Sequence, residues 1–128
     1  MTDTLRGLRD RAILETLYST GLRRQELCQL HLRHLDLAHR LVRVEHGKGG
    51  KDRIVPIGDR AIAWLERYLR EARTRFKPAP DEPAVFLNAF GRRVTGQGLG
   101  GYLRQIIRAS GLAKPGGCHL LRHAFATA

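Results

Sequence analysis

The sequence predicts an α+β fold: a mainly helical domain that carries a small antiparallel sheet. Three observations predict it. The chain has 128 residues, the size of one domain. Several segments repeat apolar residues at helical spacing. Residues 41–57, LVRVEHGKGGKDRIVPI, set two strand-like runs around a Gly-Gly centre, which indicates a β-hairpin. The short apolar run 84–88 is a candidate third strand.

The elements before the hairpin are two expected helices. In residues 8–18, Ile13 and Leu17 have the spacing of one helix face. Gly21 follows as the expected C-terminal cap. Residues 24–31 then predict a short second helix.

The elements after the hairpin begin with a helix whose expected N-cap is Asp59. Its apolar stripe consists of Ile62, Leu65, Leu69 and Ala72. The Pro-rich segment 77–83 predicts a loop, and residues 99–109 predict another helix. The Gly-Gly break at 114–117 precedes a closing helix that starts near 118.

The charge of the chain indicates a polyanionic partner. Lys and Arg number 23 against 12 Asp and Glu, a net charge of +11, and Arg outnumbers Lys 19 to 4. Arg binds phosphate with a planar, permanently charged fork, so nucleic acid is the expected partner. A merely Arg-rich composition with solvated faces is the alternative. The few aromatic residues argue against a single-strand binder that stacks bases.

Targeting signals and cysteine usage indicate the cytoplasm. No apolar run is long enough to span a membrane, and the charged N-terminus lacks the apolar centre of a signal peptide. Cys28 and Cys118 suit a reducing compartment.

Three short segments carry the polar chemistry: TGLRRQEL (20–27), HGKGGKDR (46–53) and CHLLRHAFATA (118–128). In the first segment two arginines follow a Gly turn. In the second, lysines lie at a Gly-rich hairpin tip, where the backbone can approach a ligand closely. In the third, a helix begins with His and Arg on one face. The alternatives are solvated surface charges and a soluble turn. The Gly-rich tip is not a P-loop, because GxxxxGK[ST] is absent.

In their order and spacing, TGLR-x-x-E, GKG-x-K-x-R-x-x-P and H-x-L-R-H-x-F-A-T resemble the catalytic domain of the tyrosine recombinase (phage integrase) family. The resemblance implies the DNA breaking-rejoining enzyme fold, a duplex DNA partner and bacterial nucleoid association. It also implies phosphoryl transfer without metal or cofactor. A family tyrosine attacks a DNA phosphodiester and forms a 3′-phosphotyrosyl link, which a 5′-hydroxyl later reverses.

The resemblance implies a role for each matching residue. Arg23 and Arg122 match the arginines that grip the scissile phosphate, Lys48 the general acid, and His119 the histidine that assists proton transfer. Glu26 matches the acidic residue that supports the site. The expected further DNA contacts are Lys51, Arg53 and Arg24.

Two family elements have no match in residues 1–128. Tyr18, Tyr68 and Tyr102 all precede the H-x-L-R motif, so none matches the nucleophile. No segment matches the N-terminal clamp domain. We therefore expect a partial catalytic domain that forms no covalent adduct by itself, from a parent that assembles as a homo-oligomer on DNA.

Three alternatives stay open at this point. The first is a remnant that only binds duplex DNA. The second is a metal-binding module built on Cys28, His31, His34 and His39, although this spacing matches no standard zinc pattern. The third is a type IB topoisomerase-like domain, which shares the chemistry but is less similar in the hairpin and the H-x-L-R-H-x-F-A-T segment.

Overall fold

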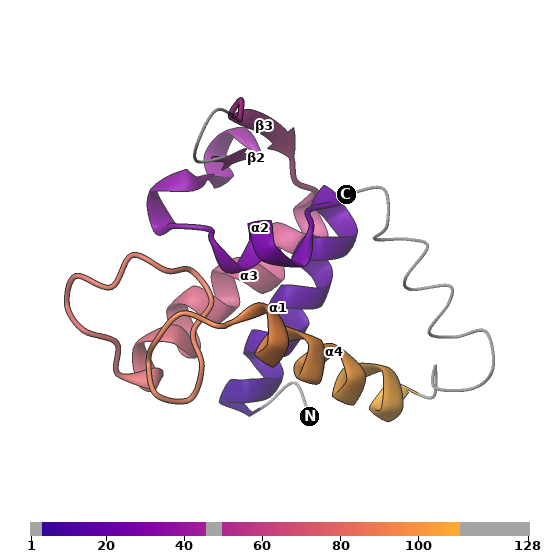
Figure 1. Ribbon diagram of the computed structural model, residues 1–128, viewed down its shortest axis with the longest axis vertical. Coiled ribbons are helices and arrows are strands. Elements are labelled where there is room, and N and C mark those ends of the chain that lie inside the picture. Colours follow the sequence, from indigo (N-terminus) through magenta and orange to yellow (C-terminus); the bar gives the residue numbers. More distant parts are fainter. Residues whose placement is uncertain (1–3, 46–49, 111–128) are drawn as a thin grey trace.

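The computed structural model describes residues 4–45 and 50–110, without the side chains of residues 106, 107, 109 and 110. The helices are α1 (Leu5–Thr20), α2 (Arg24–Cys28), α3 (Asp59–Glu71) and α4 (Gly96–Ser110). The strands are β1 (Leu35–Asp36), β2 (Leu41–Val44) and β3 (Arg53–Pro56). Single 3₁₀ turns are η1 (Leu32–His34), η2 (Leu37–His39) and η3 (Arg73–Phe76). In Figure 1 the hairpin lies at the top, α4 at the bottom, and α2 between them.

Helix α1 is capped at both ends. The Thr4 hydroxyl accepts a hydrogen bond from the Gly7 backbone nitrogen at 2.8 Å. At the other end Gly21 adopts a left-handed conformation (φ +70°), and its N–H donates to the Leu17 carbonyl at 2.9 Å. The predicted helix at 8–18 and its Gly cap are confirmed, and the helix is longer at both ends. Its buried face packs along α3.

The hairpin is confirmed as two antiparallel strands. Val42 pairs with Val55 and Val44 with Arg53, and the sheet order is β1-β2-β3. The predicted α+β architecture with a small antiparallel sheet is therefore confirmed. Its third strand is β1, next to β2, with Leu35 opposite Val42.

The prediction of a third strand at 84–88 was wrong. This run forms only isolated bridges, between His31 and Ala84 and between Leu87 and Arg93. Side chains bind its backbone groups in place of a strand: the guanidinium of Arg73 donates to the Ala84 carbonyl, and the Tyr68 hydroxyl accepts from the Leu87 nitrogen. A run bonded in this way is buried without joining a ladder.

The N-cap of helix α3 lies one residue earlier than predicted. Gly58 is its N-cap, and Asp59 is its first helical residue, where it pairs with Arg40 at 2.9 Å. The Gly58 nitrogen donates a hydrogen bond to the Ser19 hydroxyl, near the end of α1, at 2.7 Å. The predicted stripe faces inward, with Leu65 and Ala72 fully buried.

Helix α4 begins at Gly96, where the Thr95 hydroxyl accepts from the Gly98 nitrogen at 3.0 Å. The predicted helix at 99–109 is confirmed, and the closing helix expected from 118 lies outside the described residues. Among the helices of the described segments, none combines the length and the apolar character that crossing a membrane requires.

Candidate active site

The turn between α1 and α2 aims Arg23 outward. Gly21 reverses the chain, and the next residue, Leu22, is 1% exposed and enters the core. Arg23 follows as the N-cap of α2 in an extended conformation, and it is exposed. Because the buried Leu22 side chain holds the backbone in place, the α-carbon of the exposed Arg23 has a fixed position.

Glu26 holds this turn from within. Its Oε1 accepts from the Arg23 backbone nitrogen at 2.9 Å, which satisfies one of the donors at the start of α2. The same carboxylate accepts hydrogen bonds from both terminal nitrogens of Arg53, at 2.6 and 3.0 Å. The carboxylate of this bidentate pair is only 10% exposed, whereas the Arg53 side chain is 38% exposed, so water reaches the pair from the arginine side. Glu26 therefore connects the start of β3 to the start of α2.

Arg53 has a partner that the sequence pattern did not reveal. The hydrogen bonds that Arg53 donates to Glu26 raise the pKa of Arg53 above its ordinary value, against the effect of burial. Its guanidinium is thus a permanent cation in a structural pair. Its predicted contact with DNA stays a prediction.

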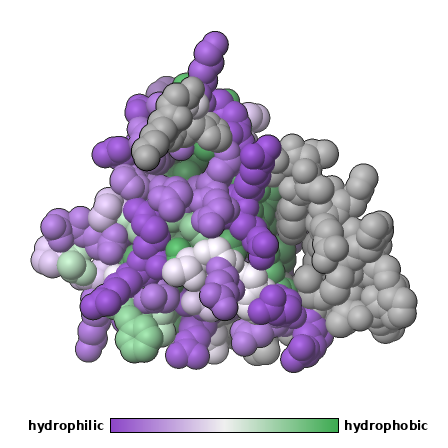
Figure 2. All heavy atoms as spheres, in the orientation of Figure 1, coloured by the Kyte–Doolittle hydropathy of each residue, from purple (hydrophilic) through white to green (hydrophobic). Residues whose placement is uncertain are grey.

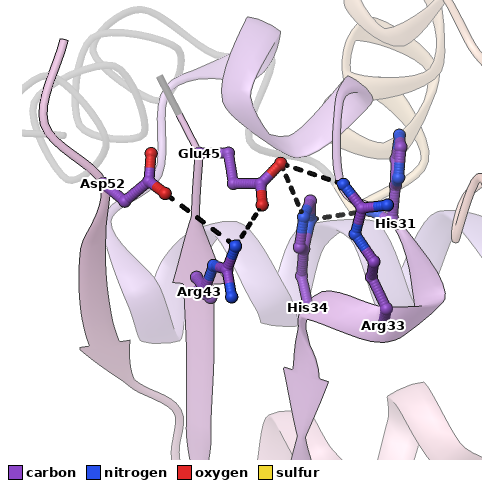
Figure 3. A network of polar contacts seen from close by, with 6 residues as sticks. All are labelled: His31, Arg33, His34, Arg43, Glu45 and Asp52. Carbon is purple, nitrogen blue, oxygen red and sulfur yellow. Dashed lines mark hydrogen bonds and ion pairs between the residues drawn. The ribbon is translucent and has the colours of Figure 1, made fainter. Parts of the chain in front are cut away.

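A second carboxylate fixes the other strand of the hairpin. Glu45 follows β2 directly, and Figure 3 shows its carboxylate among Arg33, His34 and Arg43. The distances are 3.2 Å from Oε1 to Arg33 Nη2 and 3.1 Å from Oε1 to His34 Nε2, and Arg43 Nη2 contacts Oε2. Burial raises the pKa of the Glu45 carboxyl, but the hydrogen bonds from Arg33, Arg43 and His34 outweigh it, so the pKa lies below its ordinary value.

The His34 ring contacts this cluster through both of its nitrogens. Its Nδ1 accepts from the His31 backbone nitrogen at 3.1 Å, which leaves the ring proton on Nε2, the atom nearest Glu45. The His31 ring stacks on it with centroids 5.0 Å apart. Sequence reasoning missed Glu45 and His34 as supports of the hairpin; the only signal was that Glu45 ends the alternating run.

The structure brings together part of the predicted site. Arg23, Glu26 and Arg53 meet at the start of α2, and Arg24 extends from the same turn toward α4. Lys51 is exposed just before β3. Three further predicted residues lie outside the described part of the chain: Lys48, His119 and Arg122.

The described tyrosines differ in their surroundings. Tyr68 is fully buried, donates to the Val85 carbonyl at 2.8 Å and accepts from the Leu87 nitrogen at 3.1 Å. Burial raises the pKa of Tyr68 above its ordinary range. The ring of Tyr102 lies under the guanidinium of Arg9, 3.9 Å from its centroid. Tyr18 is 70% exposed on α1.

The metal-binding alternative gains no support from residues 4–45 and 50–110. No three His, Cys, Asp or Glu side chains in these segments are arranged to hold an ion. His34 faces Glu45, and His39 pairs with Asp36 at 3.0 Å, so two of the four proposed ligands have other partners.

Comparison with known proteins gives close relatives. Tyrosine recombinase XerC 2 of Ralstonia nicotianae is 50% identical over 121 residues, which are 94% of this chain and 35% of that protein. Tyrosine recombinase XerD of Lacticaseibacillus casei is 46% identical, over 94% of this chain and 41% of that protein. The chain thus spans well under half the length of these relatives.

Solved structures share the fold. The XerA recombinase crystal structure aligns with a TM-score of 0.79 and 32% identity, covering 94% of this chain and 43% of that one. The Tn1549 transposon integrase, solved in complex with circular intermediate DNA, aligns with a TM-score of 0.71, covering 98% of this chain and 46% of that one; at 23% identity it supports the fold alone. The model of the phage integrase family matches residues 1–128. With the Arg23 turn and the hairpin in the expected order, these matches establish that the chain belongs to the phage integrase family.

Proposed function

We propose that this chain forms part of the catalytic domain of a site-specific tyrosine recombinase, which cleaves and rejoins duplex DNA. One observation carries the proposal: Arg23 is exposed at a turn that Leu22 and Glu26 hold from inside. A guanidinium with a fixed origin suits the charge that develops on the non-bridging oxygens of a phosphodiester. Membership of the phage integrase family supports the same reading.

The proposed reaction uses five side chains of this sequence, four of them catalytic and one, Glu26, supporting. Arg23 and Arg122 hold the scissile phosphate, and Glu26 holds the Arg23 turn. The oxygen of the family's tyrosine bonds to phosphorus while the bond to the 5′-oxygen breaks. Lys48 gives the leaving oxygen its proton, and His119 assists the transfer of the proton that the tyrosine hydroxyl loses. The attack of a 5′-hydroxyl reverses these steps, so the link conserves energy and no cofactor is required.

The proposed partner is duplex DNA, bound by a homo-oligomer of the parent in the bacterial cytoplasm, at the nucleoid. The net charge of +11 supports a polyanionic partner. In Figure 2 hydrophilic side chains cover much of the described part of the face in view.

A second candidate is duplex binding without strand cleavage by this chain. The observation that favours it is the environment of the tyrosines: the Tyr68 hydroxyl is buried between backbone groups, and the Tyr102 ring is covered by Arg9. Neither side chain is in a position to attack a phosphate. Tyr18 is exposed on α1, but like the other two tyrosines it precedes the H-x-L-R motif and does not match the nucleophile, so we expect that the chain alone forms no covalent adduct.

A nicked suicide duplex tests both candidates, because release of a short strand traps any phosphotyrosyl adduct. We expect salt-dependent duplex binding without adduct from the chain alone, and an adduct once the C-terminal segment of a close relative is added. Arg23→Gln should abolish that adduct, while Arg70→Gln, the same change on the exposed face of α3, should not. Binding without adduct in the complemented reaction would favour the second candidate. Absence of duplex binding would refute both.

A further inference from the structure

Two arginines lie side by side over a glycine of α4. A β-carbon placed on Gly100 would be 2.8 Å from Nη1 of Arg24 and 3.5 Å from Nη1 of Arg104. The guanidinium groups of α2 and α4 are therefore close to the same point above the helix. The side chain of Gln25 lies in the same way over Gly96, one helical turn earlier. Glycine leaves the helix backbone open at this contact, so the polar side chains of α2 rest directly on it.

Neither arginine has an acidic partner within residues 4–45 and 50–110, where no ion pair or hydrogen bond joins Arg24 or Arg104 to a carboxylate. Most other arginines near α1 and α3 do have one, such as Arg60 with Glu15 and Arg67 with Glu71. Two adjacent cations without an anion repel each other, and an anion between them would remove that repulsion. Two guanidinium groups that each have a terminal nitrogen within 3.5 Å of one point can together bind the oxygens of a phosphate.

The pair differs in position from Arg23. Consecutive residues at the start of a helix do not share a face, so Arg23 and Arg24 point in different directions from the same turn. Arg24 lies against α4, whereas the Arg23 backbone is held by Glu26. Arg24 and Arg104 share a contact point at Gly100, and Arg23 is not among the atoms near it, so we assign the pair a phosphate of its own.

We propose that Arg24 and Arg104 together bind one phosphate of the DNA backbone, separate from the phosphate that Arg23 binds, on the surface of α4 around Gly100. This second phosphate subsite rests on the proposed function, because it assumes a duplex at the Arg23 turn. It fixes the duplex relative to α2 and α4, so the scissile phosphate meets Arg23 in register. Arg104 is thereby a positioning residue that the sequence motifs do not contain.

The test measures affinity for a fluorescent mixed-sequence duplex over a range of salt concentrations, with the full chain. Arg24→Gln and Arg104→Gln should each weaken binding about tenfold at low salt. The double variant should weaken it little further, because either loss opens the same subsite. The slope of log affinity against log salt should fall by about 0.9 in the double variant, the value for one phosphate. Arg70→Gln, which removes the same charge from α3, is the matched control.

Two glycine variants of α4 give an independent test. In Gly100→Ala the new methyl group displaces the guanidinium of Arg24, whereas in Gly101→Ala the nearest side-chain atom is Arg104 Nη2 at an ordinary 3.8 Å. Alanine favours a helix over glycine at both positions, so both variants should melt at a higher temperature than the parent. Only Gly100→Ala should weaken duplex binding.

Each outcome decides the proposal. Weakened binding in both single variants and in Gly100→Ala, with the controls unchanged, supports the shared subsite. Duplex binding that Arg24→Gln and Arg104→Gln alter no more than Arg70→Gln does would overturn the subsite and leave the proposed function intact. A slope change near 1.8 in the double variant would mean two separate phosphates and also overturn it. A parent chain that binds no duplex would overturn the subsite and the proposed function together.

Discussion

Removing the carboxylate of Glu26 should loosen the hairpin from the Arg23 turn. Glu26→Gln keeps the shape of the side chain and one acceptor oxygen but removes the charge. In the native protein this carboxylate accepts two nitrogens of Arg53, at 2.6 and 3.0 Å, and the Arg23 backbone nitrogen at 2.9 Å. The substitution therefore weakens three hydrogen bonds at once, and two of them join segments that are 27 residues apart in the sequence.

The loss of stability in Glu26→Gln depends on how far each partner is hydrated once the pair is broken. Hydrogen bonds to charged groups contribute about 1.5–3 kcal/mol each when water is excluded. Glu26 is 10% exposed, but Arg53 is 38% exposed and is rehydrated when the pair breaks, which reduces the loss. We expect Glu26→Gln to lower the free energy of unfolding by about 2 kcal/mol, and the Glu26–Arg53 coupling to be about 1.5 kcal/mol.

Urea denaturation of four proteins measures this coupling: the parent, Glu26→Gln, Arg53→Gln and the double variant. The pair of Arg67 and Glu71 on α3 is the matched control, since both side chains are more than a third exposed. Its coupling should be about 0.3–0.5 kcal/mol, as for helix surface pairs. A Glu26–Arg53 coupling no larger than that of the control would refute the reasoning that the pair anchors the hairpin.

Three further changes test other parts of the structure. Gly21→Ala should lower the free energy of unfolding by about 1 kcal/mol in urea denaturation, because the φ angle of Gly21 is +70° although a β-carbon there meets no atom within 4 Å. Gly21→Asn should cost less, because asparagine tolerates the left-handed conformation better than alanine. Equal costs for the two variants would contradict a backbone origin of the effect. Tyr68→Phe should cost about 2 kcal/mol by the same measurement and leave duplex affinity unchanged, because the hydroxyl is bonded, within the part of the chain that the structure describes, to the Val85 carbonyl and the Leu87 nitrogen alone. A substitution without effect on stability would contradict this. The pKa of Glu45 is lowered in the folded chain, so its contribution to stability is complete above the unfolded pKa of about 4.3 and is lost as pH falls through the folded value. Unfolding midpoints below pH 5 should therefore fall less steeply in Glu45→Gln than in the parent, and parallel curves would show that Glu45 is not the responsible group.

The elements that the sequence predicted are those whose signals are local. Helix α1 ends at Gly21 because a left-handed cap needs glycine, and α3 exposes one face because Leu65 and Ala72 recur at helical spacing. The hairpin followed from alternation around glycines, and the order of the short motifs pointed to the family. None of these signals requires knowledge of a distant partner.

The wrong prediction concerned contacts between distant residues. The apolar run 84–88 has the composition of a strand, but Tyr68 and Arg73 bind its backbone from another element. The real third strand, Leu35–Asp36, has two residues and no periodicity to detect. For the same reason, the pattern could not reveal that Glu45 meets Arg33, because nothing in the local sequence encodes a contact across 12 residues.

The structure also gives different surroundings to two arginines for which the sequence predicts the same role. Arg24 and Arg53 were both expected to contact DNA, yet Arg53 is bonded to a carboxylate and Arg24 lies beside another cation. An arginine held by a carboxylate loses that bond if it turns to a phosphate, whereas Arg24 and Arg104 lose only their repulsion. Arg53→Gln should therefore lower the free energy of unfolding with little change in the slope of log duplex affinity against log salt. Arg24→Gln should lower that slope without lowering the free energy of unfolding. If both variants behaved alike in both measurements, the distinction between an arginine that holds the fold and one that binds the ligand would fail.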